Sequence, residues 1–190
     1  MRMTPANILT LSRLMLTPVF LALFIAGVHG WAIAVFCLAG ATDLIDGTVA
    51  RWTRKLSEDG AMLDPIADKV LVQTCFISLA VIRILPLWFV LLAASRDITI
   101  VAGIFYLRSI KAKLPYRAIV LSKLATFAMI ITAVLGLTMW YDPGIAFLGK
   151  SVGFWLGYVI IVTAALLVAS GIRYVTMGFD IMRNHRLNRT

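Results

Sequence analysis

Six long runs of apolar residues alternate with short polar connections along the chain. The runs cover residues 11–28, 31–50, 62–82, 86–107, 118–140 and 152–175. Each is close to the roughly 20 residues that an α-helix needs to cross a bilayer. Because backbone groups inside a bilayer must pair within the protein, we predict an all-α polytopic membrane protein with six transmembrane helices.

The connections between these runs are short enough for one helical bundle. Turns or loops are predicted at residues 29–30, 51–60, 83–85, 108–117 and 141–144. Residues 4–13 are polar enough to form a short N-terminal interfacial segment before the first span. No small-residue cleavage site follows that span, so we predict that it is retained. Residues 1–190 are therefore expected to form a single membrane domain.

Composition supports the membrane prediction. Of the 190 residues, 61% are hydrophobic and 14% are charged, and the mean hydropathy is +0.94, which is too apolar for a water-soluble domain. The net charge of +9 could indicate nucleic-acid binding, but the basic residues lie in short loops and tails. We interpret them as topology signals and contacts to anionic lipids, and we predict no nucleic-acid partner.

Lysine and arginine residues gather on one side of the predicted bundle. The residues on that side are Arg2, Arg51, Arg54, Lys55, Arg108, Lys111, Lys113, Arg117, Arg183, Arg186 and Arg189. The other side carries only Arg83 and Lys150. Because positively charged short loops stay in the cytoplasm, both termini and the loops after the second and fourth spans are predicted to be cytoplasmic. We expect the membrane to be the inner membrane of a bacterium.

Six of the nine acidic residues lie between Asp43 and Asp68, where the second and third runs approach the predicted cytoplasmic side. Asp43 and Asp46 are three residues apart, and so share one helical face. Asp64 and Asp68 are four residues apart and share another. Four converging carboxylates repel one another unless cations neutralise them, and their oxygen atoms select Mg²⁺, Mn²⁺ or Ca²⁺.

Two glycines and an arginine make this acidic cluster a predicted substrate site. Gly47 and Gly60 have no side chain that would keep a planar ligand away from the backbone. Arg51 lies one helical turn after Gly47, and its guanidinium suits phosphate oxygens. Ser57 can add a hydrogen bond. Together with bound metal, these groups predict a site for a nucleotide diphosphate.

The cluster has the spacing of a known family signature. Its residues are Asp43, Asp46, Gly47, Ala50, Arg51, Gly60, Asp64 and Asp68. At every position this set resembles the signature of the CDP-alcohol phosphotransferases. Asn7, Thr10 and Arg13 are similar to that family's N-terminal stretch. Six spans with a cytoplasmic catalytic face are the architecture that the resemblance implies.

The resemblance also implies an activity and a site. It implies a homodimer that transfers the phosphatidyl group of CDP-diacylglycerol to an alcohol, with release of CMP. The implied ligands of a two-metal site for Mg²⁺ or Mn²⁺ are Asp43, Asp46, Asp64 and Asp68. The implied contacts to the CDP-lipid are Asp43, Asp46, Gly47, Ala50, Arg51, Ser57 and Gly60. Asp68 is the implied general base.

Charged residues in the fourth run indicate a second polar site. Arg96 and Asp97 lie in the middle of that run, where a charge rarely faces lipid. Neighbouring residues point about 100° apart around a helix, so we predict that the two pair poorly and that each has another partner. Lys123 and Arg173 are the predicted further cations of an acceptor-binding site with Arg96. A purely structural network is the alternative.

The fifth run bears on the choice of acceptor. Ala125 stands where the phosphatidylglycerol phosphate synthases of the resembled family carry a second lysine. A dianionic phosphate monoester needs that cation more than a monoanionic diester does. We therefore favour phosphatidylglycerol as the acceptor, as in cardiolipin synthases, with glycerol 3-phosphate, as in phosphatidylglycerol phosphate synthases, as the alternative.

Two other classes of protein also place acids in a membrane. A divalent cation transporter usually binds its ion near the midplane between internal repeats, whereas these acids lie at one interface and no repeat is visible. An intramembrane prenyltransferase resembles a longer bundle with two separated Asp-rich segments, whereas this chain has one contiguous signature.

Overall fold

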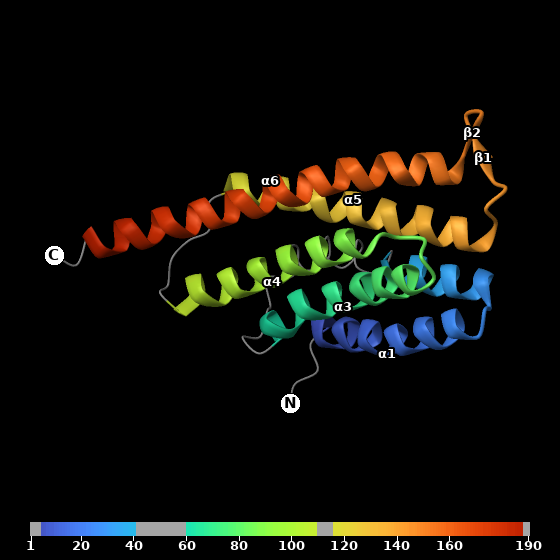
Figure 1. The fold of residues 1–190 in the computed structure, drawn as a ribbon. Coiled ribbons are helices and arrows are strands. Elements are labelled where there is room, and N and C mark those ends of the chain that lie inside the picture. The colour runs from blue at the N-terminus through green and yellow to red at the C-terminus, as the bar shows by residue number, and fades with distance from the viewer. Residues whose placement is uncertain (1–4, 41–59, 110–115, 188–190) are drawn as a thin grey trace.

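The described part of the chain is almost entirely helical (Figure 1). The computed structural model describes the backbone of residues 5–40, 60–109 and 116–187, and the side chains of residues 14–40, 69–103 and 120–177. The elements are α1 (Pro5–Ile25), the helix His29–Gly40, α3 (Gly60–Val81), α4 (Leu87–Ser109), α5 (Tyr116–Tyr141), β1 (Ala146–Phe147), β2 (Lys150–Ser151) and α6 (Val152–Leu187). The predicted helical class is confirmed.

The helices follow the predicted apolar runs, with three differences. α1 continues without a break from Pro5, so the predicted interfacial segment at residues 4–13 is not separate from the first helix. The turn predicted at residues 29–30 lies earlier, at Gly27, whose φ of 69° suits a residue without a side chain. A short β-hairpin at residues 146–151 was not predicted.

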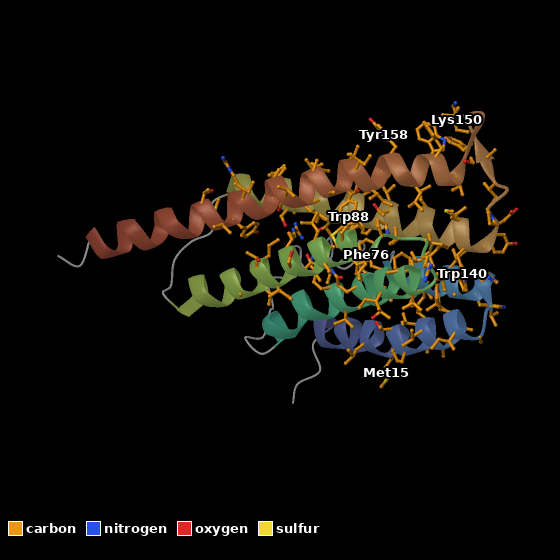
Figure 2. The ribbon with its side chains drawn as sticks, in the orientation of Figure 1. Met15, Phe76, Trp88, Trp140, Lys150 and Tyr158 are labelled. Atoms are coloured by element: carbon orange, nitrogen blue, oxygen red, sulfur yellow. The ribbon has the colours of Figure 1, made fainter. Side chains whose placement is uncertain are left out.

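α3 lies at the centre of the bundle, in contact with α1, α4 and α5, while α6 packs against α4 and α5 (Figure 1). The Phe76 ring of α3 contacts the Phe89 ring of α4, with centroids 5.3 Å apart. On the α5 side, a Cβ atom at Gly136 would lie only 2.7 Å from Leu79 Cδ1. Interlocking side chains fill the space between the helices (Figure 2). Such close packing favours association where the surroundings are also apolar.

Large apolar side chains also cover the outside of the described helices. Trp31 and Ile98 are each 69% exposed, and Ile161 is 68% exposed. Soluble monomers rarely expose extensive apolar surface, so this exterior suits a lipid environment. Two stretches of the described residues, Val120–Tyr141 and Val152–Met177, are long and apolar enough to cross a membrane.

The other predicted spans are less complete in the described residues. Shorter apolar helices cover Leu14–Ile25, His29–Gly40 and Lys69–Val81. Residues 41–50 of the second predicted span lie outside the described part of the chain.

The hairpin between α5 and α6 closes one end of the bundle (Figure 1). Its antiparallel register pairs Phe147 with Lys150, so Leu148 and Gly149 form a two-residue loop. Both loop residues have positive φ, 51° at Leu148 and 72° at Gly149, as a type I′ turn requires. The Trp155 indole nitrogen donates to the Phe147 carbonyl at 2.9 Å and so ties the hairpin to α6.

Leu148 is expected to strain this turn, because a left-handed backbone costs a residue with a Cβ atom about 1–2 kcal/mol. Leu148→Asn should therefore raise the free energy of unfolding by about 1 kcal/mol, since asparagine tolerates this conformation. Reversible unfolding in detergent micelles measures the change. Phe147→Asn, one residue earlier in β1, is the matched control and should give no gain. Equal effects at the two positions would contradict the assignment of strain to Leu148.

Candidate active site

Most of the predicted donor-site residues lie outside the described part of the chain. Those residues are Asp43, Asp46, Gly47, Ala50, Arg51 and Ser57. Gly60, Asp64 and Asp68 lie on α3, where the structure describes their backbone only. Gly60 is the first residue of that helix.

The helical backbone of α3 places Asp64 and Asp68 about one turn apart, roughly 6 Å along the axis. Such a pair of carboxylates suits a hard divalent cation such as Mg²⁺ or Mn²⁺. Among the side chains that the structure describes, no three acidic, histidine or cysteine groups cluster as metal ligands.

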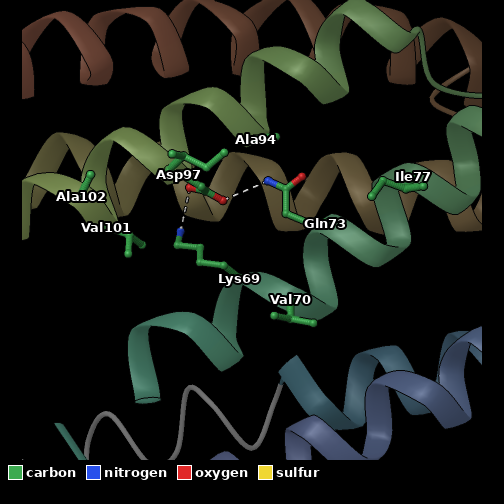
Figure 3. A pocket seen from close by; sticks show the side chains of 9 residues that line it. Lys69, Val70, Gln73, Ile77, Ala94, Asp97, Val101 and Ala102 are labelled. Atoms are coloured by element: carbon green, nitrogen blue, oxygen red, sulfur yellow. Dashed lines mark hydrogen bonds and ion pairs between the residues drawn. The ribbon is translucent and has the colours of Figure 1, made fainter. Parts of the chain in front are cut away.

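A polar network begins one residue after Asp68 on the same helix. The Lys69 ammonium lies 3.1 Å from Asp97 Oδ1 on α4. One turn further along α3, the Gln73 side-chain nitrogen donates to Asp97 Oδ2 at 3.1 Å. Figure 3 shows both contacts converging on the Asp97 carboxylate. Asp97 therefore links α3 to α4 through both of its oxygen atoms.

Arg96 extends the network to the other two helices. Its Nη1 donates to Asp97 Oδ1 at 2.8 Å. Its Nη2 contacts the Ser122 hydroxyl on α5 at 2.8 Å and the Ser122 carbonyl at 3.1 Å. The same nitrogen contacts the Ser170 hydroxyl on α6 at 3.3 Å. Arg96 therefore reaches α5 and α6 from α4.

The prediction that Arg96 and Asp97 pair poorly was wrong. The guanidinium lies at the end of a long flexible stem, which spans the angle between neighbouring helical positions. The prediction that each residue has a further partner is confirmed by the contacts of Asp97 with Lys69 and of Arg96 with Ser122. Such pairing is the usual condition for charges within an apolar bundle.

Burial makes these contacts energetically important. Arg96 is 3% exposed and Asp97 is 4% exposed, so water contributes little to either charge. Removing one partner of a buried ion pair leaves an uncompensated charge and typically costs about 3–5 kcal/mol. The Arg96 Nε and the Gln73 side-chain oxygen have no hydrogen-bond partner among the described residues.

A cavity of about 500 Å³ lies between α3 and α4 beside this network (Figure 3). Its lining is almost entirely apolar, with aliphatic side chains such as Ile77 and Val101, and Lys69, Gln73 and Asp97 are the polar residues that border it. The α3 contacts of the network thus border the cavity, whereas Arg96 is not among the lining residues. Lys69 retains 19% side-chain exposure here.

Lys123 and Arg173, the other predicted acceptor residues, are exposed and make no contact with Arg96 in the described structure. The residues that do contact Arg96 are small: Ser122 directly precedes Lys123, and Ser170 lies three residues before Arg173. Sequence reasoning missed both serines. It also missed Lys69 and Gln73, although two polar residues four positions apart in an apolar run are a usable signal.

Comparison with known proteins identifies the family. The family model for the CDP-alcohol phosphatidyltransferases matches residues 3–169. The match covers most of the chain and includes every signature residue from Asp43 to Asp68. The chain therefore belongs to the CDP-alcohol phosphatidyltransferases, a family of membrane-associated transferases. This membership gives no support to the cation-transporter alternative.

Curated relatives carry two names within this family. The chain is 41% identical over 106 residues to the "Cardiolipin synthase (CMP-forming)" of Rattus norvegicus, covering 55% of this chain and 35% of that protein. It is 34% identical over 112 residues to the protein of the same name from Streptomyces coelicolor, covering 56% and 52%. A Mycobacterium tuberculosis protein named "Probable phosphatidylglycerophosphate synthase" is 44% identical over 99 residues, covering 49% and 47%. The alignments thus span about a third to a half of these relatives.

Thiol labelling tests the difference in exposure between the predicted cations and the serines behind them. In a Cys37→Ser background, which removes the exposed native thiol, Lys123→Cys and Arg173→Cys should react readily with a maleimide in detergent. Ser170→Cys is the matched control on α6, and because Ser170 is 1% exposed, it should react at least about tenfold more slowly. Rapid labelling of the control would contradict the described packing.

Proposed function

We propose that this protein transfers the phosphatidyl group of CDP-diacylglycerol to an alcohol and releases CMP. The family match over residues 3–169, with the signature intact from Asp43 to Asp68, is the observation that carries the proposal. Both names found among the relatives describe synthases of glycerol-containing phospholipids. That agreement supports a glycerol-containing acceptor.

The proposed donor site uses the signature residues. Mg²⁺ or Mn²⁺, bound by Asp43, Asp46, Asp64 and Asp68, would supply positive charge against the diphosphate. The proposed contacts to the CDP-lipid are Asp43, Asp46, Gly47, Ala50, Arg51, Ser57 and Gly60. The α3 backbone supports this set, because it places Asp64 and Asp68 one turn apart.

Asp68 is the proposed general base. Its carboxylate takes the proton of the acceptor hydroxyl as the acceptor oxygen bonds to the lipid-bearing phosphorus. The bond from that phosphorus to the CMP oxygen breaks, and Arg51 helps to neutralise the departing phosphate.

Phosphatidylglycerol is the proposed acceptor, which makes the reaction that of a cardiolipin synthase. Ala125 is fully buried in the apolar core, so position 125 contributes no cation. Asp97 already neutralises much of the Arg96 charge, which leaves Lys123 and Arg173 as the exposed cations of the proposed acceptor site. The proposed preference for a monoanionic diester over a dianionic monoester rests on the lack of a further cation at position 125. The Rattus norvegicus and Streptomyces coelicolor relatives agree with this choice by name.

Glycerol 3-phosphate is the alternative acceptor, and one observation favours it. The Mycobacterium tuberculosis relative, which has the highest of the three identities at 44%, is named for phosphatidylglycerophosphate synthesis.

The proposed setting is a homodimer in the inner membrane of a bacterium. Six spans, with both termini and the donor site on the cytoplasmic side, agree with the Lys and Arg asymmetry of the loops. The apolar exterior of the described helices also supports a membrane-embedded bundle.

Substitution of the signature aspartates tests the donor site. Asp43→Asn, Asp46→Asn and Asp64→Asn should each abolish metal-dependent CMP release, because each weakens a metal ligand. Asp68→Asn should lower kcat by about 10²–10⁴-fold, the range of general-base contributions. Glu58→Gln, an acidic residue outside the signature, is the matched control and should keep near-normal rates. Normal turnover in two or more of the first three variants would sink the donor-site assignment.

An acceptor screen tests the reaction. With purified protein, CDP-diacylglycerol and Mg²⁺ or Mn²⁺, added phosphatidylglycerol should stimulate CMP release and yield a four-chain lipid identifiable by mass spectrometry. If only glycerol 3-phosphate stimulates release, the acceptor proposal fails and phosphatidylglycerol phosphate synthesis replaces it. If neither does, while CMP is still released, the acceptor belongs to another class of alcohol.

A further inference from the structure

Two neighbouring residues of α4 connect four helices. Asp97 holds α3 through Lys69 at 3.1 Å and Gln73 at 3.1 Å. Arg96 holds α5 through Ser122 at 2.8 Å and α6 through Ser170 at 3.3 Å. The direct contact between Arg96 and Asp97, at 2.8 Å, joins the two sets. We refer to Arg96 and Asp97 together as the hub.

On the α3 side, the hub contacts lie beside the proposed donor residues. Lys69 directly follows Asp68, and Gln73 lies about one turn further along the same helix. A shift of α3 that broke the Lys69–Asp97 contact would therefore also move Asp64 and Asp68, because a helix moves as a nearly rigid rod over so short a distance.

On the α5 and α6 side, the hub contacts lie beside the proposed acceptor cations. Ser122 directly precedes Lys123, and Ser170 lies three residues before Arg173. Both cations are exposed, whereas both hub partners are wholly or partly buried. Arg96 thus holds α5 and α6 at the level of the proposed acceptor cations.

We propose that the hub positions the donor and acceptor halves of the active site relative to each other. Asp97 fixes α3 and the aspartates on it, and Arg96 fixes α5 and α6 with Lys123 and Arg173. Arg96 and Asp97 are positioning residues in this role, since they act through other side chains. The inference rests on the proposed function, because the two halves are defined by the CDP-lipid and the acceptor.

A positioning role of the hub can be distinguished from a role in packing alone and from a direct effect of the Lys69 charge on the donor site. Apolar side chains of similar volume often stabilise a core as well as a buried ion pair does, so stability alone does not account for charges here. A direct effect of Lys69 would also have the opposite sign. Removing its positive charge beside Asp68 would strengthen the binding of Mn²⁺ alone, whereas a shift of α3 would weaken it, so the Kd for Mn²⁺ without lipid separates the two effects.

Two variants test the two sides of the hub separately. Lys69→Met removes the contact to Asp97, and the adjoining cavity gives the new side chain room. The double variant Ser122→Ala and Ser170→Ala removes both hydroxyl partners of Arg96. Thr132→Val is the matched control, because the Thr132 and Thr163 hydroxyls form a separate buried hydrogen bond between α5 and α6 at 3.1 Å.

Four quantities are measured on full-length protein in lipid nanodiscs: the Kd for Mn²⁺ alone, the Kd for CDP-diacylglycerol with Mn²⁺, the KM for phosphatidylglycerol, and the Tm. Lys69→Met should raise the donor Kd about tenfold and leave the acceptor KM within about twofold. The double serine variant should show the reverse pattern. Thr132→Val should lower Tm and leave both constants within about twofold.

Each other outcome has a definite meaning. Tighter binding of Mn²⁺ by Lys69→Met, an unchanged donor Kd and acceptor KM in both test variants, or equal changes of the donor Kd and the acceptor KM in each would overturn the positioning role. These results would leave the proposed function intact, provided that the wild-type protein binds the donor and uses the acceptor. A wild-type protein that binds no CDP-diacylglycerol in the presence of Mn²⁺ would instead overturn the proposed function and this inference with it.

Discussion

The ion pair between Arg96 and Asp97 is the polar contact on which the arrangement of α3, α4, α5 and α6 depends. A charge in an apolar bundle must be paired, and both of these residues are nearly inaccessible. Their partners come from α3, α5 and α6. The two charged side chains therefore make all of their polar contacts only when these three helices are in place. Apolar contacts between helices are less selective, because a lipid-facing surface and a packed surface have similar chemistry. Polar contacts at the hub therefore specify which faces meet.

Close packing completes what the polar contacts specify. The approach of α5 to α3 at Gly136 is close, since a Cβ atom there would lie 2.7 Å from Leu79 Cδ1 and would require that side chain to move. The buried hydrogen bond between Thr132 and Thr163 adds a second polar contact between α5 and α6. Small residues and hydroxyl groups at helix contacts are typical of membrane bundles. The same chemistry recurs at Ser122 and Ser170, where small hydroxyl side chains let a long arginine lie between helices.

The sequence predicts the local features of this protein better than the contacts between helices. Each run of apolar residues directly predicts a helix. The signature from Asp43 to Asp68 depends only on the spacing of residues along the chain. The partners of Arg96 depend on which faces of α5 and α6 turn inward, and Lys123 was a more obvious candidate than Ser122 because it is charged. The turn at residues 148–149 was missed because leucine is an unusual residue at positive φ.

The hairpin at the far end of the bundle has a consequence for the other end. Paired strands and a two-residue loop fix the register in which α5 ends and α6 begins. From there Lys123 lies about 27 Å back along α5 and Arg173 about 32 Å along α6, at 1.5 Å per residue. Because the hairpin fixes where α5 ends and α6 begins, it also determines how Lys123 and Arg173 align at the other end of the two helices. A longer loop can accommodate an insertion of one residue without changing either helix. An insertion within α5 or α6, between the hairpin and the cation, would rotate Lys123 or Arg173 by about 100° relative to the other.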